Sequence, residues 1–275
     1  MKEIIVDTLL DIIKVIPFLL IAFIIIEYTE HKINEKGKNI IKKSGKLGPI
    51  FGSILGVIPQ CGFSVMATNL YITRIISLGT LISIYLSTSD EMLLIMMAEK
   101  APIKIIMSII LFKIIIGMIC GIIIDLLINK KEKNYDICKH DHCDCENNFL
   151  KSAIKHTIKT SLFLLIITFI INVGFHYIGE ERIKLIFKHN NLLTPFITSL
   201  IGLIPNCGSS VILTELYLNN ILSLAQSIAG LLTNSGVALL VLFKTNKNIK
   251  ENLKIVGIIY TIGTAIGIFL EIMKI

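Results

Sequence analysis

Charged residues are scarce in this sequence: Asp, Glu, Lys and Arg make up 17% of its 275 residues, against about 25% in an ordinary soluble domain. Tryptophan is absent, and only six prolines interrupt the chain. Hydrophobic residues make up 53%, and the mean hydropathy is +0.77. This composition excludes a disordered chain and argues against a water-soluble globule. It predicts a polytopic membrane protein.

Recognisable catalytic motifs are also missing. The sequence has no nucleophile elbow, no glycine-rich phosphate loop and no His-Glu-x-x-His motif, so we expect neither an enzyme nor a bound cofactor. The formal charge is +7, but the basic residues lie between apolar runs rather than in one patch. We therefore interpret them as orientation signals in a bilayer and expect no nucleic-acid partner.

Several apolar runs are long enough to cross a bilayer as helices, since a spanning helix needs roughly 20 apolar residues. The uninterrupted runs are 8–28, 102–128, 157–177 and 253–273. Four more runs are broken by proline or by short polar stretches, namely 47–72, 75–98, 193–218 and 221–243. The predicted fold is therefore an all-α polytopic membrane protein in which some helices are broken.

The broken runs belong to an internal duplication with a constant offset of 146 residues. Residues 49–94 and 195–240 align without a gap, and 20 of the 46 aligned positions are identical. Shared apolar bias explains some Leu and Ile matches, but not matched Pro, Cys, Gly and Tyr. We predict a first membrane repeat over 1–128, a cytosolic linker over 129–150, and a second membrane repeat over 151–275.

The distribution of basic residues favours repeats of inverted topology. If runs 47–72 and 193–218 are re-entrant hairpins, each repeat crosses three times and the repeats must be inverted. Lys and Arg then number 17 on the inner side and 7 on the outer side, as the positive-inside rule expects. If those runs cross fully, the repeats are parallel and the bias weakens to 15 against 9. We expect a plasma-membrane protein with an outside amino terminus.

The hairpin runs are interrupted by the same motif, Pro-x-Cys-Gly. Proline cannot donate a backbone hydrogen bond, so each helix must stop there, and paired broken helices in inverted repeats point to a transport site at their interface. A structural kink and small buried cysteines are the alternative interpretation. The candidate substrate-binding residues are Gln60, Cys61, Gly62, Asn206, Cys207 and Gly208.

A few ionisable residues lie within the apolar runs, where unpaired charge is costly and usually marks an ion pathway. Asp90 and Glu91 interrupt one run, and the aligned stretch of the second repeat contains Asn234. Glu215 aligns with Asn69, and Lys113 is the expected charge partner of the buried acids. Carboxylate, amide and hydroxyl oxygens suit a hard divalent ion such as Mn²⁺, and protons are the candidate coupling ion.

The linker contains a dense set of soft and borderline metal ligands. They lack the paired spacing of a zinc finger, so we expect a flexible metal-capturing or sensing loop; a solvated polar linker is the alternative. The candidate ligands are Cys138, His140, His142, Cys143 and Cys145.

The duplicated Pro-x-Cys-Gly motif, with the His/Cys linker between its copies, resembles the ten-span heavy-metal exporter family. Its members are labelled arsenic efflux proteins or manganese transporters, and organoarsenical permeases are more distantly similar. The resemblance covers nearly the whole chain and implies export of a metal or metalloid. It also implies ten segments, which match if each hairpin contributes two short helices. Only the Pro, Cys and Gly of each break and the linker Cys and His carry over. This linker has two histidines, fewer than the resemblance leads us to expect.

The functional hypothesis is a secondary-active exporter of a heavy-metal ion, with Mn²⁺ or a similar divalent cation favoured, at a midplane site between the repeats. An arsenite or organoarsenical efflux permease is the rival, because arsenite would require thiols such as Cys61 and Cys207. A lipid-phosphate hydrolase and a non-transporting metal sensor are further alternatives. The sequence leaves the oligomeric state open, and a homo-oligomer is compatible with it.

Overall fold

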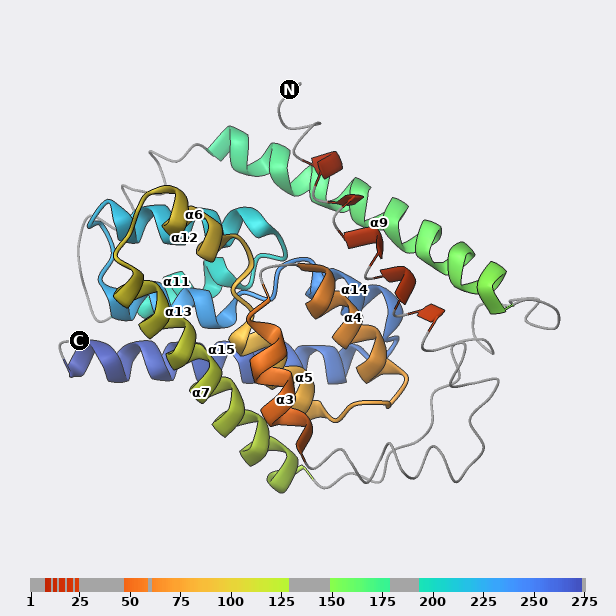
Figure 1. Ribbon diagram of the computed structural model, residues 1–275, viewed down its shortest axis with the longest axis horizontal. Helices are drawn as coiled ribbons and strands as arrows, with labels where there is room; N and C mark the ends of the chain where they lie inside the picture. The colour runs from red at the N-terminus through yellow and green to blue at the C-terminus, as the bar shows by residue number, and fades with distance from the viewer. Residues whose placement is uncertain are drawn as a thin grey trace.

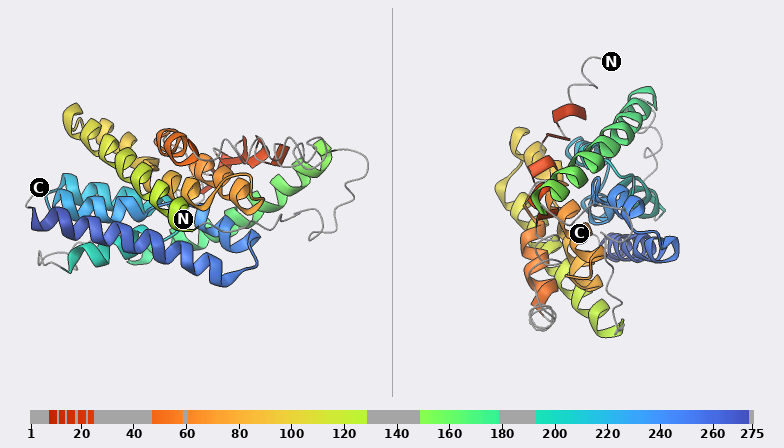
Figure 2. Two further views of the ribbon diagram at one scale, coloured as in Figure 1. Left: turned by 90° about the horizontal axis from the view of Figure 1, so that it is seen from below. Right: turned by 90° about the vertical axis from the view of Figure 1, so that its right-hand side faces the viewer.

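The computed structural model describes residues 47–58, 61–128, 149–178 and 193–273, together with most positions between 8 and 24. The described part is helical and contains no strand, which confirms the all-α prediction. Its helices pack side by side in an elongated bundle (Figure 1 and Figure 2). Five helical segments are long and apolar enough to span a membrane: Leu78–Ala98, Ile103–Leu127, Ala153–Ile170, Leu224–Thr245 and Ile249–Ile272.

The duplication seen in the sequence is visible in the helices. The first set is α3 (Gly48–Gly56), α4 (Cys61–Ile72), α5 (Leu78–Ser87), α6 (Asp90–Ala98) and α7 (Ile103–Leu127). The second is α11 (Thr194–Gly202), α12 (Cys207–Leu218), α13 (Leu224–Thr233), α14 (Ala238–Thr245) and α15 (Ile249–Ile272). The bounds of α3, α4 and α5 shifted by 146 are those of α11, α12 and α13. Helix α9 (Phe149–Ile178) precedes the second set and begins earlier than the run 157–177 predicts.

Small residues bring α3 close to α5. A Cβ atom added to Gly48 would lie 2.2 Å from the hydroxyl of Thr80, and one added to Gly56 would lie 2.2 Å from that of Ser87. With Gly52 between them, these glycines recur every four residues, a spacing that closely packed membrane helices commonly use. Because the start of α3 meets the start of α5 and its end meets the end of α5, the two helices are parallel.

This parallel packing shows that α3 and α4 form a hairpin. Helix α4 ends at Ile72, only six residues before α5 begins, so it returns to the end of the molecule from which α3 started. The end of α3 therefore lies level with the end of α5. The second set repeats the arrangement, since a Cβ added to Gly202 at the end of α11 would lie 2.1 Å from the carbonyl oxygen of Gly230 on α13.

An acidic residue near the end of each set's last helix caps the start of that set's broken span, which is α5–α6 in the first set and α13–α14 in the second. In the first set, Ser77 donates to Asp125 Oδ2 at 2.5 Å, and the backbone N–H of Gly79 donates to Oδ1 at 2.7 Å. In the second, Ser223 donates to Glu271 Oε2 at 2.8 Å, and Gln226 Nε2 donates to Oε1 at 3.1 Å. Carboxylates suit the free N–H groups of a helix start. Helix α7 therefore runs antiparallel to α5, as α15 does to α13.

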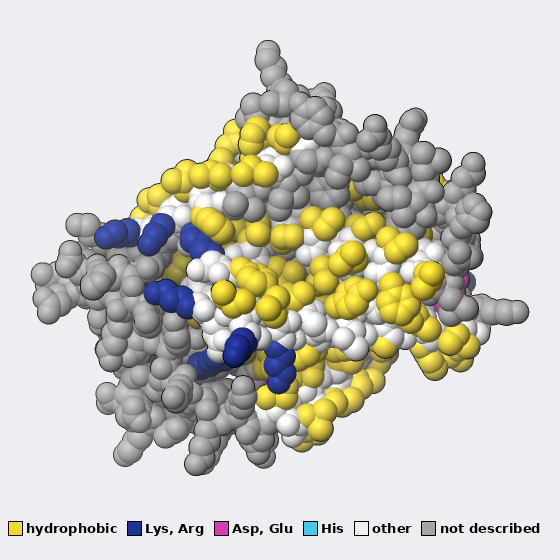
Figure 3. Space-filling view, turned by 180° about the vertical axis from the view of Figure 1, so that it is seen from behind, with side chains coloured by type: hydrophobic (Ala, Val, Ile, Leu, Met, Phe, Trp, Pro, Cys, Tyr) yellow, Lys and Arg dark blue, Asp and Glu magenta, His cyan; other side chains and the backbone are white. Residues whose placement is uncertain are grey.

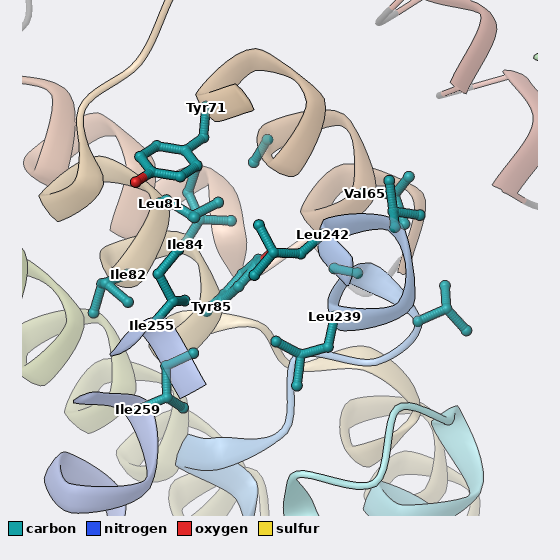
Figure 4. Close-up of a cluster of buried hydrophobic side chains, with 14 of the residues drawn as sticks. Val65, Tyr71, Leu81, Ile82, Ile84, Tyr85, Leu239, Leu242, Ile255 and Ile259 are labelled. Atoms are coloured by element: carbon teal, nitrogen blue, oxygen red, sulfur yellow. The ribbon is translucent and has the colours of Figure 1, made fainter. Parts of the chain in front are cut away.

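The two sets exchange contacts reciprocally. Helix α4 packs on α14, and its counterpart α12 packs on α6, while α5 meets α13 between them. One apolar cluster joins Val65 of α4 and Tyr85 of α5 to Leu239 and Leu242 of α14 and Ile255 of α15 (Figure 4). A second cluster joins α6 and α7 to α12 and α13. The core therefore lies between the sets.

Apolar side chains cover much of the outer surface, as expected where lipid is the solvent. The broken span α13–α14 is 89% buried inside the molecule, whereas α15 is 33% buried and α7 is 28% buried. The face seen in Figure 3 is a broad apolar surface with basic side chains gathered at one end. The broken spans are thus internal, and the unbroken helices contact the bilayer.

Candidate functional site

The two broken spans are interrupted at aligned positions. Helix α5 ends at Ser87, Thr88 caps it by donating its hydroxyl to the carbonyl of Ile84 at 2.7 Å, and α6 begins at Asp90. Helix α13 ends at Thr233, and α14 begins at Ala238 after a turn through Gly236, whose φ is 56°. The predicted breaks are confirmed. Non-helical backbone at membrane depth is tolerated where it is enclosed by protein or lines a wet cavity.

Lys113 connects the breaks of the two sets. Its side chain on α7 is 1% exposed, and its Nζ donates to the carbonyl oxygen of Thr88 and, at 2.8 Å, to that of Leu231. These carbonyls belong to the final turn or cap of α5 and α13, where helix dipoles are negative. The carboxyl ends of both half-helices therefore converge on one ammonium group.

The hairpin helices lie against the breaks with their polar sides. Ser64 on α4 donates to the carbonyl of Ser235 in the second break at 3.4 Å. Within the second set, Ser209 on α12 donates to Asn234 Oδ1 at 3.5 Å, and the same oxygen accepts the N–H of Gly236 at 2.9 Å. Asn234 is thus fixed between the hairpin and the break.

The start of α12 is shaped by Asn206. Its side-chain oxygen accepts the N–H of Gly208 at 3.1 Å, which caps the helix. Asn206 and Asn234 are both buried, Gly208 is half-buried, and Gly62 is buried in the first turn of α4. The structure therefore brings Asn206, Gly208 and Asn234 to one region of the second set, and the role of each in substrate binding stays a prediction.

Other predicted residues are placed only by their backbone. Cys61 and Cys207 begin α4 and α12. Asp90 and Glu91 begin α6, and Asp90 lies two residues after Thr88, whose carbonyl accepts from Lys113. Their side chains lie outside the described part of the structure. Glu215 is half-buried on α12.

The remaining candidates fall outside the described residues altogether. They are Gln60 and the linker ligands Cys138, His140, His142, Cys143 and Cys145. Within the residues that are described, no group of three His, Cys, Asp or Glu side chains is arranged to hold a metal ion. The predicted metal-binding role of the linker therefore stays a prediction.

Some buried polar side-chain atoms lack a hydrogen-bond partner, one of them in the second break. Both polar atoms of the Asn69 amide and the hydroxyl of Ser235 are buried and make no hydrogen bond. Such groups are rare in folded proteins, because an unsatisfied buried polar group is costly. In the sequence, only the alignment of Asn69 with Glu215 of the second repeat marked Asn69 as a residue of interest.

An ion pair that the repeat pattern does not predict joins the two sets away from the breaks. Arg74, in the turn after α4, binds Glu251 at the start of α15 with Nη1 to Oε1 at 2.8 Å and Nη2 to Oε2 at 3.0 Å. Tyr71 donates to Oε1 at 2.5 Å. Burial opposes the guanidinium charge, but the hydrogen bonds to Glu251 prevail, and the pKa of Arg74 is raised above its usual value.

Comparison with protein families agrees with these observations. The family described as "Putative, 10TM heavy-metal exporter" matches residues 1–176 and, in a second, overlapping match, residues 128–269. The chain belongs to this family. Membership of the heavy-metal exporter family, together with five helices apolar enough to span a membrane, supports a metal transporter of the membrane. No curated protein and no solved structure matches the chain.

Proposed function

We propose that this protein is a secondary-active exporter that moves a divalent heavy-metal cation, with Mn²⁺ favoured, through a site between its two repeats. The observation that carries the proposal is Lys113. Its buried ammonium group binds carbonyls at the broken ends of both repeats, and a charge kept at membrane depth is typical of ion pathways.

Inverted topology is part of this proposal, and the Arg74–Glu251 pair supports it. The pair holds the end of α4, and with it the nearby start of α5, beside the start of α15. Because α13 and α14 together form one span, the start of α13 lies on the opposite side of the membrane from the start of α15. Helices α5 and α13 would then enter from opposite sides, and their carboxyl ends would meet near the midplane.

The orientation we propose places the linker in the cytosol and the amino terminus outside. Most of the described basic residues outside Lys113 belong to the end of the molecule that carries the Arg74–Glu251 pair, and several gather there in Figure 3. They are Arg74, Lys155, Lys159, Lys244, Lys247, Lys250 and Lys254. Lys100 and Lys104 lie toward the opposite end. This imbalance supports a cytosolic linker side.

The substrate class follows from the donors expected at the breaks. Two acids, Asp90 and Glu91, begin α6 beside the site of one fixed cation, Lys113, so the centre would carry one net negative charge when both acids are ionised. Amide and hydroxyl oxygens such as those of Asn234 and Ser209 lie by the other break. Oxygen donors of this kind suit Mn²⁺. Protons competing for the same carboxylates would supply the coupling.

The experiment is Mn²⁺ transport in proteoliposomes, measured with and without a pH gradient. We expect Asp90→Asn together with Glu91→Gln to abolish transport, because the cation would lose its charged ligands. Glu99→Gln is the matched control, since Glu99 is an exposed acid at the other end of α6. Wild-type transport in the double variant would overturn the proposal.

Arsenite is the second candidate substrate, because Cys61 and Cys207 begin the two hairpin helices α4 and α12 and thiols are the soft ligands in that region. Cys61→Ala combined with Cys207→Ala separates the candidates. Under the Mn²⁺ proposal this variant retains Mn²⁺ transport. Loss of arsenite transport in it, with no Mn²⁺ transport by the wild type, would favour the arsenite permease instead.

A further inference from the structure

A groove separates the two unbroken helices α7 and α15 on the lipid-facing surface. Its volume is about 570 Å³, within the range of about 300–1,000 Å³ of small-molecule sites. Cys120 and Ile123 of α7 form one wall, and Gly257 and Ile262 of α15 form the other. A Cβ added to Gly257 would meet no atom within 4 Å, so the absence of a side chain there keeps the groove open.

The interior of the groove is apolar. Thr261 contributes a hydroxyl to the wall, but that hydroxyl donates to the carbonyl of Gly257 at 2.7 Å and is satisfied within its own helix. Water in this groove would find few hydrogen-bond partners, whereas a hydrocarbon chain would bury apolar surface and make dispersion contacts.

One charged residue, Lys254, lies in the groove wall near the start of α15. It follows Ile249 by five residues, which corresponds to about 7.5 Å along a helix, so its ammonium can reach the phosphate level of the bilayer by extending its side chain. No described residue forms an ion pair with Lys254. Exposed Lys247 and Lys250 lie nearby in sequence at the same end.

We infer that this groove binds an anionic phospholipid of the linker-side leaflet, with an acyl chain between α7 and α15 and the phosphate against Lys254. The apolar walls match the chain, and the positive charge at the shallow end matches the headgroup. Basic pockets between membrane helices bind anionic lipids by this combination of contacts. The inference depends on the membrane location of α7 and α15 and not on the identity of the transported metal.

The lack of tryptophan in the chain makes a fluorescence test direct. Ile123→Trp places a single tryptophan in the groove wall, and Ile115→Trp places one on an exposed part of α7 outside it. Quenching is measured in vesicles of mixed phosphatidylglycerol and phosphatidylcholine, in which either one or the other lipid carries bromine at the same acyl carbons. Comparing the two lipids removes the effect of depth.

We expect phosphatidylglycerol to be favoured about fivefold at Ile123→Trp and not at Ile115→Trp. Adding Lys254→Gln should remove that preference, whereas Lys247→Gln, which removes the same charge outside the groove wall, should leave most of it. Adding Gly257→Leu, which fills the groove, should weaken quenching by both lipids.

Equal quenching by the two lipids at Ile123→Trp would overturn the inference, as would equal effects of Lys254→Gln and Lys247→Gln. If both lipids quench Ile123→Trp only weakly, and two chains can be cross-linked through Cys120, a second copy of the chain fills the groove instead. Failure of Mn²⁺ transport would leave this result unchanged, so the two proposals are separable.

Discussion

Arg74 and Glu251 form a two-pronged ion pair between the repeats, and neither residue has a charged counterpart at the position 146 residues away. Asn220 aligns with Arg74, and Ile105 aligns with Glu251. The turn itself is duplicated, since Arg74 and Asn220 both have positive φ, at 62° and 56°. The backbone is therefore repeated, whereas the charge that joins the repeats exists on one side only.

The first prediction concerns this pair. Glu251→Gln should lower the free energy of unfolding by about 1–3 kcal/mol, because Arg74 loses a charge-assisted partner in a half-buried setting. The charge-swapped double variant Arg74→Glu with Glu251→Arg should recover part of that loss. Thermal unfolding in detergent measures both. A double variant no better than the sum of its single variants would show that the pair contributes no coupling energy.

A second prediction concerns Lys113. Lys113→Gln should reduce transport at least tenfold, because the carbonyls of Thr88 and Leu231 lose their shared donor and the charge balance at the breaks changes. Lys104→Gln, on an exposed part of the same helix, should have little effect on transport in proteoliposomes.

The predicted pairing of Lys113 with the acids of α6 has its own check. If Lys113 neutralises Asp90, the variant Lys113→Gln with Asp90→Asn should fold more stably than Lys113→Gln alone, since no buried charge would be left without compensation. If Glu91 is the partner, Glu91→Gln should be the substitution that recovers stability. Recovery by neither variant would contradict the pairing.

The duplicated helix caps yield a third prediction. Asp125→Asn and Glu271→Gln should each lower the free energy of unfolding by about 1–2 kcal/mol, since each weakens charge-assisted bonds at the start of a buried half-helix. The caps lie in different repeats, so their effects should add in the double variant. A strong departure from additivity in thermal unfolding would argue against independent caps.

The fourth prediction uses the glycines. Gly202→Ala should be strongly destabilising, because its Cβ would lie 2.1 Å from the backbone oxygen of Gly230 and force α11 away from α13. Gly257→Ala is the matched control, since nothing lies within 4 Å of that Cβ, and alanine favours a helix over glycine by about 1 kcal/mol. Similar stability of the two variants would contradict the close packing.

The sequence by itself determined the class of fold and the positions of the breaks. Apolar runs too long and too poor in charge for a soluble protein imply membrane helices, and the ungapped offset of 146 residues predicted a second set of helices aligned with the first. Pro59 and Pro205 marked the hairpins because proline has no backbone N–H to donate and so ends a helix in any surroundings. Asp125 and Glu271 also lie 146 residues apart in the sequence, but this offset does not reveal their role as caps.

Only the tertiary structure decided which residues of different repeats meet. Local pattern contains no information on the packing of α4 against α14, so the Arg74–Glu251 pair could not be predicted from either segment alone. The sequence predicted that Lys113 neutralises an acid. The structure adds that Lys113 binds the carbonyls of Thr88 and Leu231, which lie 143 positions apart in the sequence and belong to different repeats. The physical reason is that hydrogen bonds and charges act through space, whereas periodicity and helix breaking act along the chain.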